Sequence, residues 1–193
     1  MSSTHYDKPE YPGDSRPETQ KHIDLVNEYG KTFTGKLLTR LVSHDASKLV
    51  EPEHKFFDQG TPQLQKTTFG DKDYDSAKDK IKEGIEHHYR FNDHHPEHFG
   101  KAGVSGMNLY QLIEMYLDWR AASKRHDTGN IFNSIQANLD KYPERNFGQQ
   151  VYDIFLNTAM VDEPSALATA NDKVKEYLAG KTGASKEATE EKD

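Results

Sequence analysis

Histidines and carboxylates gather at three places along the sequence. The first is the adjacent pair His44-Asp45, and the second is residues 86–98, which hold five of the ten histidines of the chain. The third is Asp118, with Glu114 one helical turn before it. Imidazole and carboxylate ligands together suit manganese, iron, cobalt, nickel or zinc. Because the chain has no cysteine, thiolate sites are excluded, and the three segments predict a His/Asp site for one or two divalent ions, with magnesium as a further option.

Spacing narrows the choice among the clustered histidines. His87 and His94 are seven residues apart, as are His88 and His95, so either pair can lie on one helix face about two turns apart. His88 is in register with the isoleucines three and seven positions before it, which favours the pair His88 and His95. The bend that Pro96 imposes on a helix can bring either pair to the same ion. The alternative is a polar segment exposed to solvent.

For His44, Asp45 and Asp118, too, the alternative to metal binding is a position exposed to solvent. His44 and Asp45 can both bind a metal only if the helix before them ends there, and an adjacent His-Asp pair is more often a solvated helix end. Asp118 lies between Leu117 and Ala121 on an apolar helix, so an inward and a surface position are equally compatible with the pattern.

Taken together, these segments resemble the HD-domain superfamily of metal-dependent phosphohydrolases. The order of His22, His44-Asp45, the histidine cluster and Asp118 is similar to that of the superfamily, and residues 44–48 are similar to its His-Asp-x-x-Lys element. More closely, residues 22–158 are similar to an uncharacterised family of bacteria and phages. The matching pieces are His-Asp-Ala-Ser-Lys-Leu (44–49), Glu-His-His-Tyr-x-x-Asn-x-His-His-Pro-Glu-His-Phe (86–99), Met-Asn-Leu (107–109) and Ile-Glu-Met-x-x-Asp-Trp (113–119).

The resemblance implies hydrolysis of a nucleotide or another small phosphoester. The implied metal ligands are His22, His44, Asp45, His88, His95 and Asp118. His22 is the conditional member, because in one straight helix it would lie about 33 Å from His44. A turn between Gly30 and Gly35 would bring the two level, so both arrangements stay open.

Roles for further residues follow from the same hypothesis. Lys48, one turn after His44, is expected to bind substrate phosphate and to take part in catalysis. Glu97 or Glu114 is expected to act as general base or proton shuttle. An acidic protein needs a local positive rim to admit an anion, and the expected substrate-binding residues are Arg90, Asn92, Arg120 and Lys124.

Two alternatives belong to other functional classes. A histidine-rich pair of metals on an HD-type scaffold can be a di-iron centre that uses dioxygen, which would make the protein an oxygenase. In the second alternative the metal is structural or absent, and the protein is a binding or regulatory module such as a phage accessory protein.

The elements that must position these residues are predicted to be helices. Apolar residues recur at helical spacing, no stretch alternates like a confident strand, and the fold class is therefore a single all-α, HD-domain-like bundle with disordered ends. We expect an extended arm over 1–16, a helical metal-binding domain over 17–178 and a disordered acidic tail over 179–193. Helices are predicted over 17–43, 50–57, 81–95, 109–119, 130–139, 149–160 and, weakly, 164–178, with Asn108 as the N-cap of the strongest.

Composition limits the partners. With 25 Lys and Arg against 32 Asp and Glu, the chain has a formal charge of -7, so binding to duplex nucleic acid or anionic lipid is not expected. No apolar run is long enough to span a membrane, and a cytoplasmic protein is expected, in the host cytoplasm if a phage encodes it. Aromatic residues on the later helices leave a homo-oligomer open.

Overall fold

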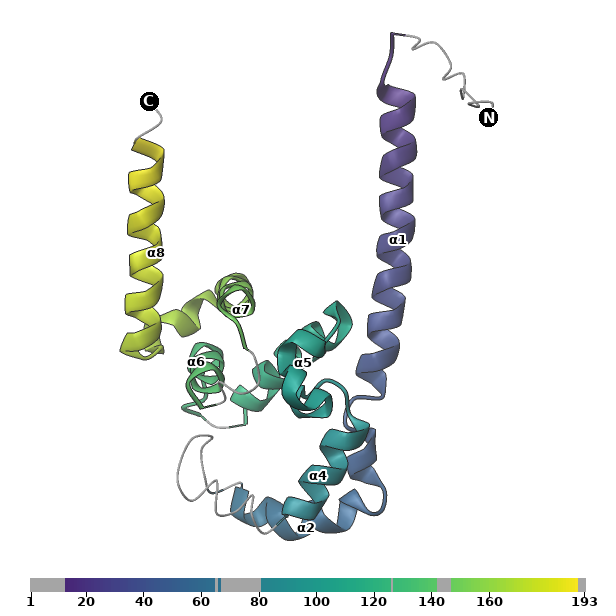
Figure 1. Cartoon of the computed structure of the whole chain (residues 1–193), viewed down its shortest axis with the longest axis vertical. Coiled ribbons are helices and arrows are strands. Elements are labelled where there is room, and N and C mark those ends of the chain that lie inside the picture. Colours follow the sequence, from purple (N-terminus) through teal and green to yellow (C-terminus); the bar gives the residue numbers. More distant parts are fainter. Residues whose placement is uncertain (1–12, 65, 67–80, 126, 142–146, 191–193) are drawn as a thin grey trace, which may run out of the picture. The chain divides into compact units, whose positions relative to one another are not determined.

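The regular structure of the chain is helical throughout. The computed structural model describes residues 13–64, 66, 81–125, 127–141 and 147–190, and it contains no strand among them, which confirms the predicted all-α fold (Figure 1). The chain divides into two compact units, Met1–Ser43 and His44–Asp193. The boundary between them lies inside the range 17–178 that the sequence predicts as one domain.

The first unit contains one long helix, α1 (Arg16–Val42). Pro17 lies in its first turn, where its missing N–H costs no hydrogen bond, and Glu18 and Arg40 complement the helix dipole at the two ends. The helix is continuous through Gly30 and Gly35. Of the arm predicted over 1–16, residues 1–12 lie outside the described part of the chain.

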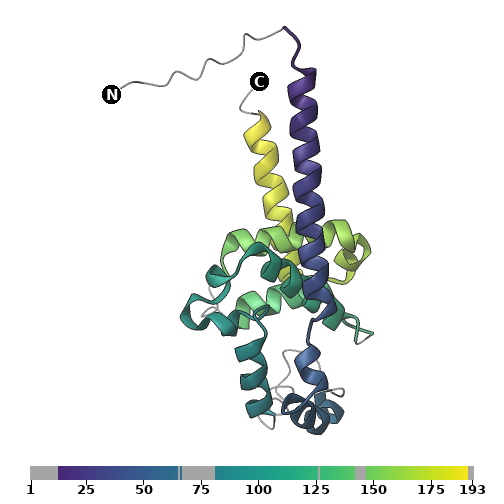
Figure 2. The same ribbon diagram turned by 90° about the vertical axis from the view of Figure 1, so that its right-hand side faces the viewer.

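The second unit begins with the elements that hold the candidate site. A short 3-10 turn, η1 (Ala46–Leu49), leads to α2 (Glu53–Leu64). The helix α4 (Lys82–Phe91) packs against α2, as Figure 2 shows, and η2 (Pro96–Gly106) follows it. The two helices approach closely because each presents a glycine: a Cβ on Gly84 would lie 2.5 Å from Phe56 Cβ, and one on Gly60 would lie 2.5 Å from Ile81 Cγ2.

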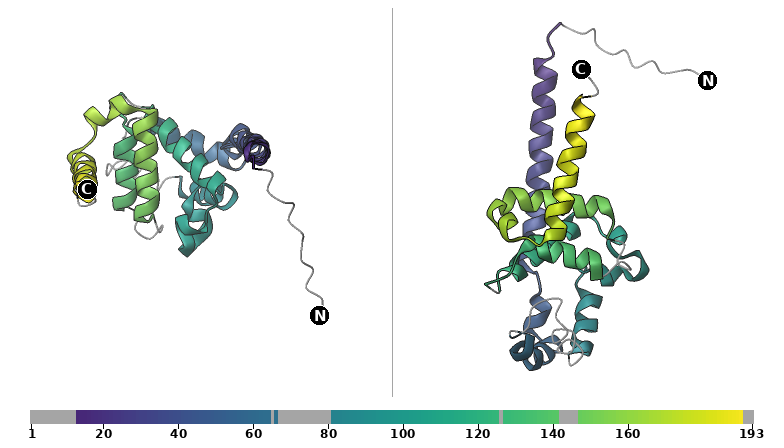
Figure 3. Two further views of the ribbon diagram at one scale, coloured as in Figure 1. Left: turned by 90° about the horizontal axis from the view of Figure 1, so that it is seen from above. Right: turned by 90° about the vertical axis from the view of Figure 1, so that its left-hand side faces the viewer.

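The remaining helices enclose the apolar core. They are α5 (Leu109–Ser123), α6 (Ile131–Lys141), α7 (Gln149–Asp162), the 3-10 turn η4 (Pro164–Thr169) and α8 (Asp172–Glu190). The helices α6 and α7 lie side by side, and η4 leads from α7 to α8 (Figure 3). Phe132, Ile135, Leu156 and Val174 are fully buried between them. Asn108 caps α5 as predicted, accepting from the Gln111 N–H while the Gln111 side chain accepts from the Asn108 N–H.

Several predicted boundaries differ from those of the structure. The helix predicted from Val50 begins only at Glu53, after the cis Glu51-Pro52 bond, and it continues to Leu64 instead of ending at Phe57. The helix predicted to reach His95 ends at Phe91, with Asn92 extended. Part of the tail predicted to be disordered is helical as far as Glu190, because its alanines, lysines and glutamates are strong helix formers; residues 191–193 lie outside the described part.

No helix among the described residues has both the length and the apolar character that a membrane span requires.

Candidate metal centre

The centre is built around Asp45, whose backbone has an uncommon conformation. Asp45 is the one described non-glycine residue with a positive φ, at 56°. Aspartate tolerates this left-handed conformation better than most residues. The turn follows the end of α1 and begins η1, so His44 and Asp45 leave helical geometry together. This is the condition under which two adjacent residues can serve one site.

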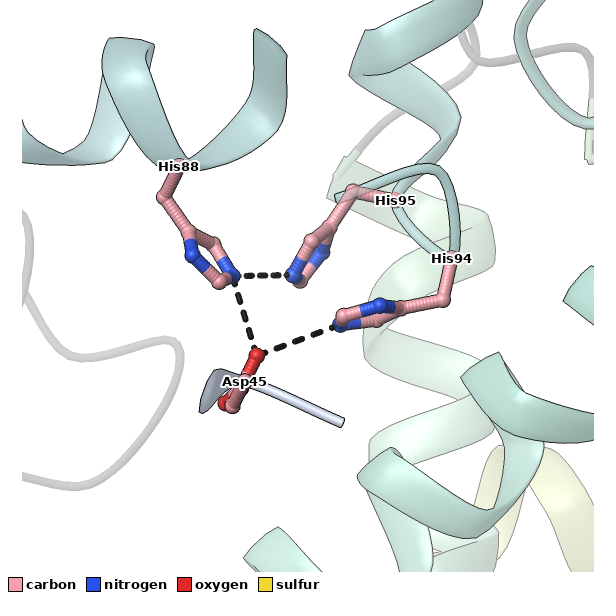
Figure 4. A group of neighbouring side chains, drawn as sticks. All are labelled: Asp45, His88, His94 and His95. Carbon is pink, nitrogen blue, oxygen red and sulfur yellow. Dashed lines mark hydrogen bonds and ion pairs between the residues drawn. The ribbon is translucent and has the colours of Figure 1, made fainter. Parts of the chain in front are cut away.

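Three histidines from α4 and the loop after it surround the Asp45 carboxylate (Figure 4). Asp45 Oδ1 lies 3.1 Å from His88 Nε2 and 3.4 Å from His94 Nε2. His95 Nε2 lies 3.0 Å from His88 Nε2. Their ligand atoms all lie within 4.8 Å of one another, so these four residues could hold a metal ion.

A second group of possible ligands adjoins the first. His44, His94 and Asp118 also place one ligand atom each within 4.8 Å of one another, and His44 Nε2 lies 3.6 Å from Asp118 Oδ1 and 3.7 Å from Asp45 Oδ2. His94 belongs to both groups, and the two Asp45 oxygens face different groups. The arrangement has the donors for two neighbouring ions.

Two buried glutamates lie behind the histidines. Glu53, with no exposed surface, has its carboxylate 2.9 Å from His88 Nδ1 and 2.7 Å from His87 Nδ1, and it accepts from Ser47 Oγ at 2.8 Å. Glu114 Oε1 lies 3.0 Å from His44 Nδ1 and 3.3 Å from His94 Nδ1. Histidines that bind metals commonly have such a carboxylate on the second ring nitrogen.

Ionisation in the centre follows from these contacts. Burial alone would raise the pKa of Asp45, but His88, His94 and Lys48 outweigh it and hold that pKa well below its usual range. Asp118 and then Glu114 raise the pKa of His44 to about 10. Burial, together with the neighbouring His94 and His88, holds the pKa of His95 well below its usual range. The Asp45 carboxylate is therefore ionised and His95 neutral, the forms in which both bind metals, whereas His44 holds a second proton that it must release before its Nε2 can bind a metal.

Two buried atoms of the centre lack a hydrogen-bond partner within the described part of the chain: Asp45 Oδ1 and His94 Nε2. Buried polar atoms are nearly always satisfied, and these two face each other at 3.4 Å with a carboxylate oxygen and a ring nitrogen. A cation between them would satisfy both. The donor set of oxygen and imidazole nitrogen therefore fits a divalent metal.

The structure brings together five of the six residues predicted as ligands: His44, Asp45, His88, His95 and Asp118. The sixth, His22, needs a break in the first helix, and α1 has none. His22 is an exposed residue of α1, about 30 Å along the helix axis from Val42.

The predicted ligands and their partners include neither His94 nor Glu53. Both histidine pairs were possible from the spacing, and register along a helix favoured His88 and His95, but the helix ends at Phe91 and register does not apply beyond it. The signal available was the His94-His95 pair itself. For Glu53, which follows Pro52 in an unremarkable acidic stretch, the sequence carries no comparable signal.

The residues predicted for catalysis and substrate binding have different surroundings. Lys48 Nζ bonds Asp45 Oδ2 at 2.6 Å and is part-exposed, at the edge of the centre. Asn92 donates to Ser47 Oγ at 2.8 Å, behind His88 instead of toward a substrate. Arg90 is exposed on α4, and Glu97 is half-buried in η2.

Three further predicted residues have carboxylate or histidine partners in the structure. Glu114 is buried and faces the rear nitrogens of two histidines. Arg120 pairs with Asp162 and Glu163, and Lys124 also pairs with Glu163. These two cations contact carboxylates at the end of α7, and their predicted part in a positive rim stays a prediction.

Comparison with known proteins gives a family without an assigned activity. The model described as "Family of unknown function (DUF5662)" matches residues 13–161. No curated protein and no solved structure matches the chain. The match includes α1 and every residue of the centre, while kinship with the HD-domain superfamily stays a prediction.

Proposed function

The chain belongs to DUF5662, a family of unknown function, and from its centre we propose that it is a metal-dependent hydrolase of a nucleotide or other small phosphoester. One or two divalent ions are held by Asp45, His88, His94 and His95, with His44 and Asp118 serving the neighbouring position. Donor atoms that are all nitrogen or oxygen favour manganese, iron, cobalt, nickel or zinc, and magnesium would be bound more weakly.

The observation that carries the proposal is the convergence on Asp45 Oδ1. An ionised oxygen and two imidazole Nε2 atoms meet within 3.1 to 3.4 Å, and the second nitrogen of each ring already contacts a glutamate. With both Nε2 atoms unprotonated, all three atoms are acceptors, and a cation between them offsets their repulsion. Such a centre fits a metal better than a hydrogen-bonded core.

The chemistry that follows is activation of water next to a phosphoryl group. A bound divalent ion lowers the pKa of its water and polarises a phosphoryl oxygen. Lys48 lies at the centre, 2.6 Å from Asp45 Oδ2 with a third of its side chain exposed, and in this proposal it binds the phosphate of a substrate. Ions and Lys48 together supply the local positive charge that a protein of net charge -7 needs to admit an anion.

The test combines metal content with turnover. Protein without a histidine tag is analysed for metals by mass spectrometry and is then assayed against nucleotides and simple phosphoesters with each divalent ion. Asp45→Asn, whose side chain tolerates the left-handed backbone, should lose both bound metal and turnover. Asp127→Asn, an exposed aspartate outside the centre, should keep both.

Other outcomes assign other functions. Equal metal content in the two variants would remove the proposed centre. Iron with a visible absorption band and consumption of dioxygen would favour the oxygenase. A fold that depends on metal, with no phosphoester turned over, would favour the non-enzymatic binding protein.

A further inference from the structure

The two buried glutamates behind the histidines have a common geometry. Glu53 on α2 contacts the Nδ1 atoms of His87 and His88, and Glu114 on α5 contacts those of His44 and His94. Each carboxylate therefore meets two histidines, always at Nδ1. In three of the four histidines of the centre, His44, His88 and His94, Nε2 is the nitrogen nearest to Asp45 or Asp118.

A neutral histidine has one N–H and one lone pair, and its neighbours decide which nitrogen has which. An ionised glutamate only accepts hydrogen bonds. Glu53 receives the Ser47 hydroxyl at 2.8 Å and faces two ring nitrogens at 2.7 and 2.9 Å, which are the surroundings of an ionised carboxylate. A ring nitrogen 2.9 Å from this oxygen must therefore carry hydrogen, and the lone pair of His88 is left on Nε2.

The surroundings of His88 support the same assignment. The Asn92 amide nitrogen is also 2.9 Å from His88 Nδ1, and an N–H donated to that atom would demand the opposite tautomer. However, the two amide hydrogens of Asn92 have other acceptors, Ser47 Oγ at 2.8 Å and the His88 carbonyl at 2.9 Å. Ser47 in turn donates to Glu53 at 2.8 Å. The chain of donors runs from Asn92 through Ser47 to Glu53, and Glu53 is its final acceptor.

We propose that Glu53 and Glu114 are positioning residues that fix His88, His44 and His94 with hydrogen on Nδ1 and direct their Nε2 lone pairs to the metal centre. Glu53 acts on the first group of ligands through His88. Glu114 acts on both groups, because His94 belongs to each. That the lone pairs bind a metal rests on the proposed function, whereas the tautomers do not depend on it.

The two glutamates offer a matched pair of substitutions. Methionine has a similar length and no comparable acceptor, so in Glu53→Met the Ser47 hydroxyl loses its acceptor and turns to His88 Nδ1, 3.4 Å away, and the hydrogen of His88 moves to Nε2. Glutamine keeps one carbonyl oxygen. In Glu53→Gln the carbonyl oxygen takes the position of Oε2, where Ser47 and His88 donate. The amide nitrogen then takes the position of Oε1 and faces His87. His88 then keeps its tautomer and His87 changes.

The first measurement is the tautomer of His88, read from the ¹⁵N shifts of histidine-labelled, metal-free full-length protein at alkaline pH. Hydrogen on Nδ1 is expected in the wild type and in Glu53→Gln, and hydrogen on Nε2 in Glu53→Met. Hydrogen on Nε2 in the wild type would overturn the proposal even if a variant does not fold. An unchanged His88 in folded Glu53→Met would overturn it as well.

The second measurement is the affinity for Zn²⁺, by competition with a chelator. Loss of a carboxylate behind a ligating histidine typically weakens metal binding roughly 10–100-fold. We expect that loss in Glu53→Met and Glu114→Met, and a much smaller one in both glutamine variants; equal losses in the methionine and glutamine variants would show a role of charge alone and contradict the proposal. If the wild type binds no Zn²⁺ while His88 has the expected tautomer, the metal centre fails and the positioning role of Glu53 survives.

Discussion

At the scale of single residues, Lys48 allows the proposed metal binding and the proposed substrate binding to be tested separately. Its Nζ bonds Asp45 Oδ2, the oxygen that does not face His88 and His94, and the same Nζ lies over the Phe57 ring, 5.1 Å from the ring centroid. Lys48 is therefore not itself a ligand, although it touches one.

We predict that Lys48→Met keeps bound metal and loses turnover. Methionine keeps an unbranched apolar side chain of similar length and removes the cation. A hydrogen bond to a charged group contributes about 2 kcal/mol, so kcat/KM for a phosphoester should fall roughly 30-fold. The control is Lys55→Met, an exposed lysine of α2. Unchanged kcat/KM in Lys48→Met would leave Lys48 as a structural partner of Asp45 only.

The residues of the centre differ in how far the sequence predicts them. His44, Asp45 and Asp118 stand out because the residue types themselves are ligands, and His88 because it shares register with apolar residues. His94 and the two glutamates depend on where the chain leaves helix α4 and on which helices pack behind it. Spacing along the chain predicts neither the end of α4 nor the helices that pack behind the centre, because contacts between residues far apart in sequence determine both.

At the scale of elements, the packing of α2 on α4 decides where Glu53 meets the histidines. Glu53 lies in the first turn of α2, and His87 and His88 lie on α4. Gly84 lies one turn before His87 and His88, and Gly60 lies seven residues after Glu53. Neither glycine is a proposed ligand, so this packing can be changed without removing one.

We predict that Gly84→Ala destabilises the protein. A Cβ there would lie 2.5 Å from Phe56 Cβ, closer than atoms can pack, and the helices must shift apart. Overpacking of this kind costs about 1–3 kcal/mol, measurable as a lower free energy of unfolding in urea. Gly30→Ala is the matched control, because nothing lies within 4 Å of a Cβ in that part of α1 and alanine is the better helix former by about 1 kcal/mol. Equal changes in both variants would contradict close packing at Gly84.

Local signals predict helices better than they predict ends. Asn108 was recognised as the N-cap of α5 because capping depends on residues within one turn, and the structure has the full capping box there. By contrast, the predicted helix continued toward Pro96, whereas α4 stops at Phe91. The next residue, Asn92, hydrogen-bonds Ser47, which lies 45 positions away in sequence.

At the scale of the whole molecule, ion pairs between distant helices link stability to pH. Glu163 follows α7 and is 8% exposed, and it pairs with Arg120 and Lys124 of α5 and its end. Sequence analysis placed both cations near a substrate, because no rule of spacing connects them to a carboxylate about 40 residues later. Burial alone would raise the pKa of Glu163, but Lys124 and Arg120 outweigh it and lower that pKa.

A lowered pKa fixes the sign of the effect. In the unfolded chain the pKa of a glutamate side chain is about 4.3, and in the folded protein Glu163 keeps its charge to a lower pH. The stabilisation is therefore fully present above that pH and is lost as the pH falls through the pKa of the folded state. We predict that the free energy of unfolding in urea decreases across this acidic range and that Glu163→Gln reduces the decrease. Glu176→Gln, an exposed glutamate of α8, should leave the pH dependence as in the wild type. Both proteins are measured without added metal, so that the histidine centre contributes equally to each. Parallel pH profiles for the wild type and Glu163→Gln would contradict a stabilising role for these ion pairs.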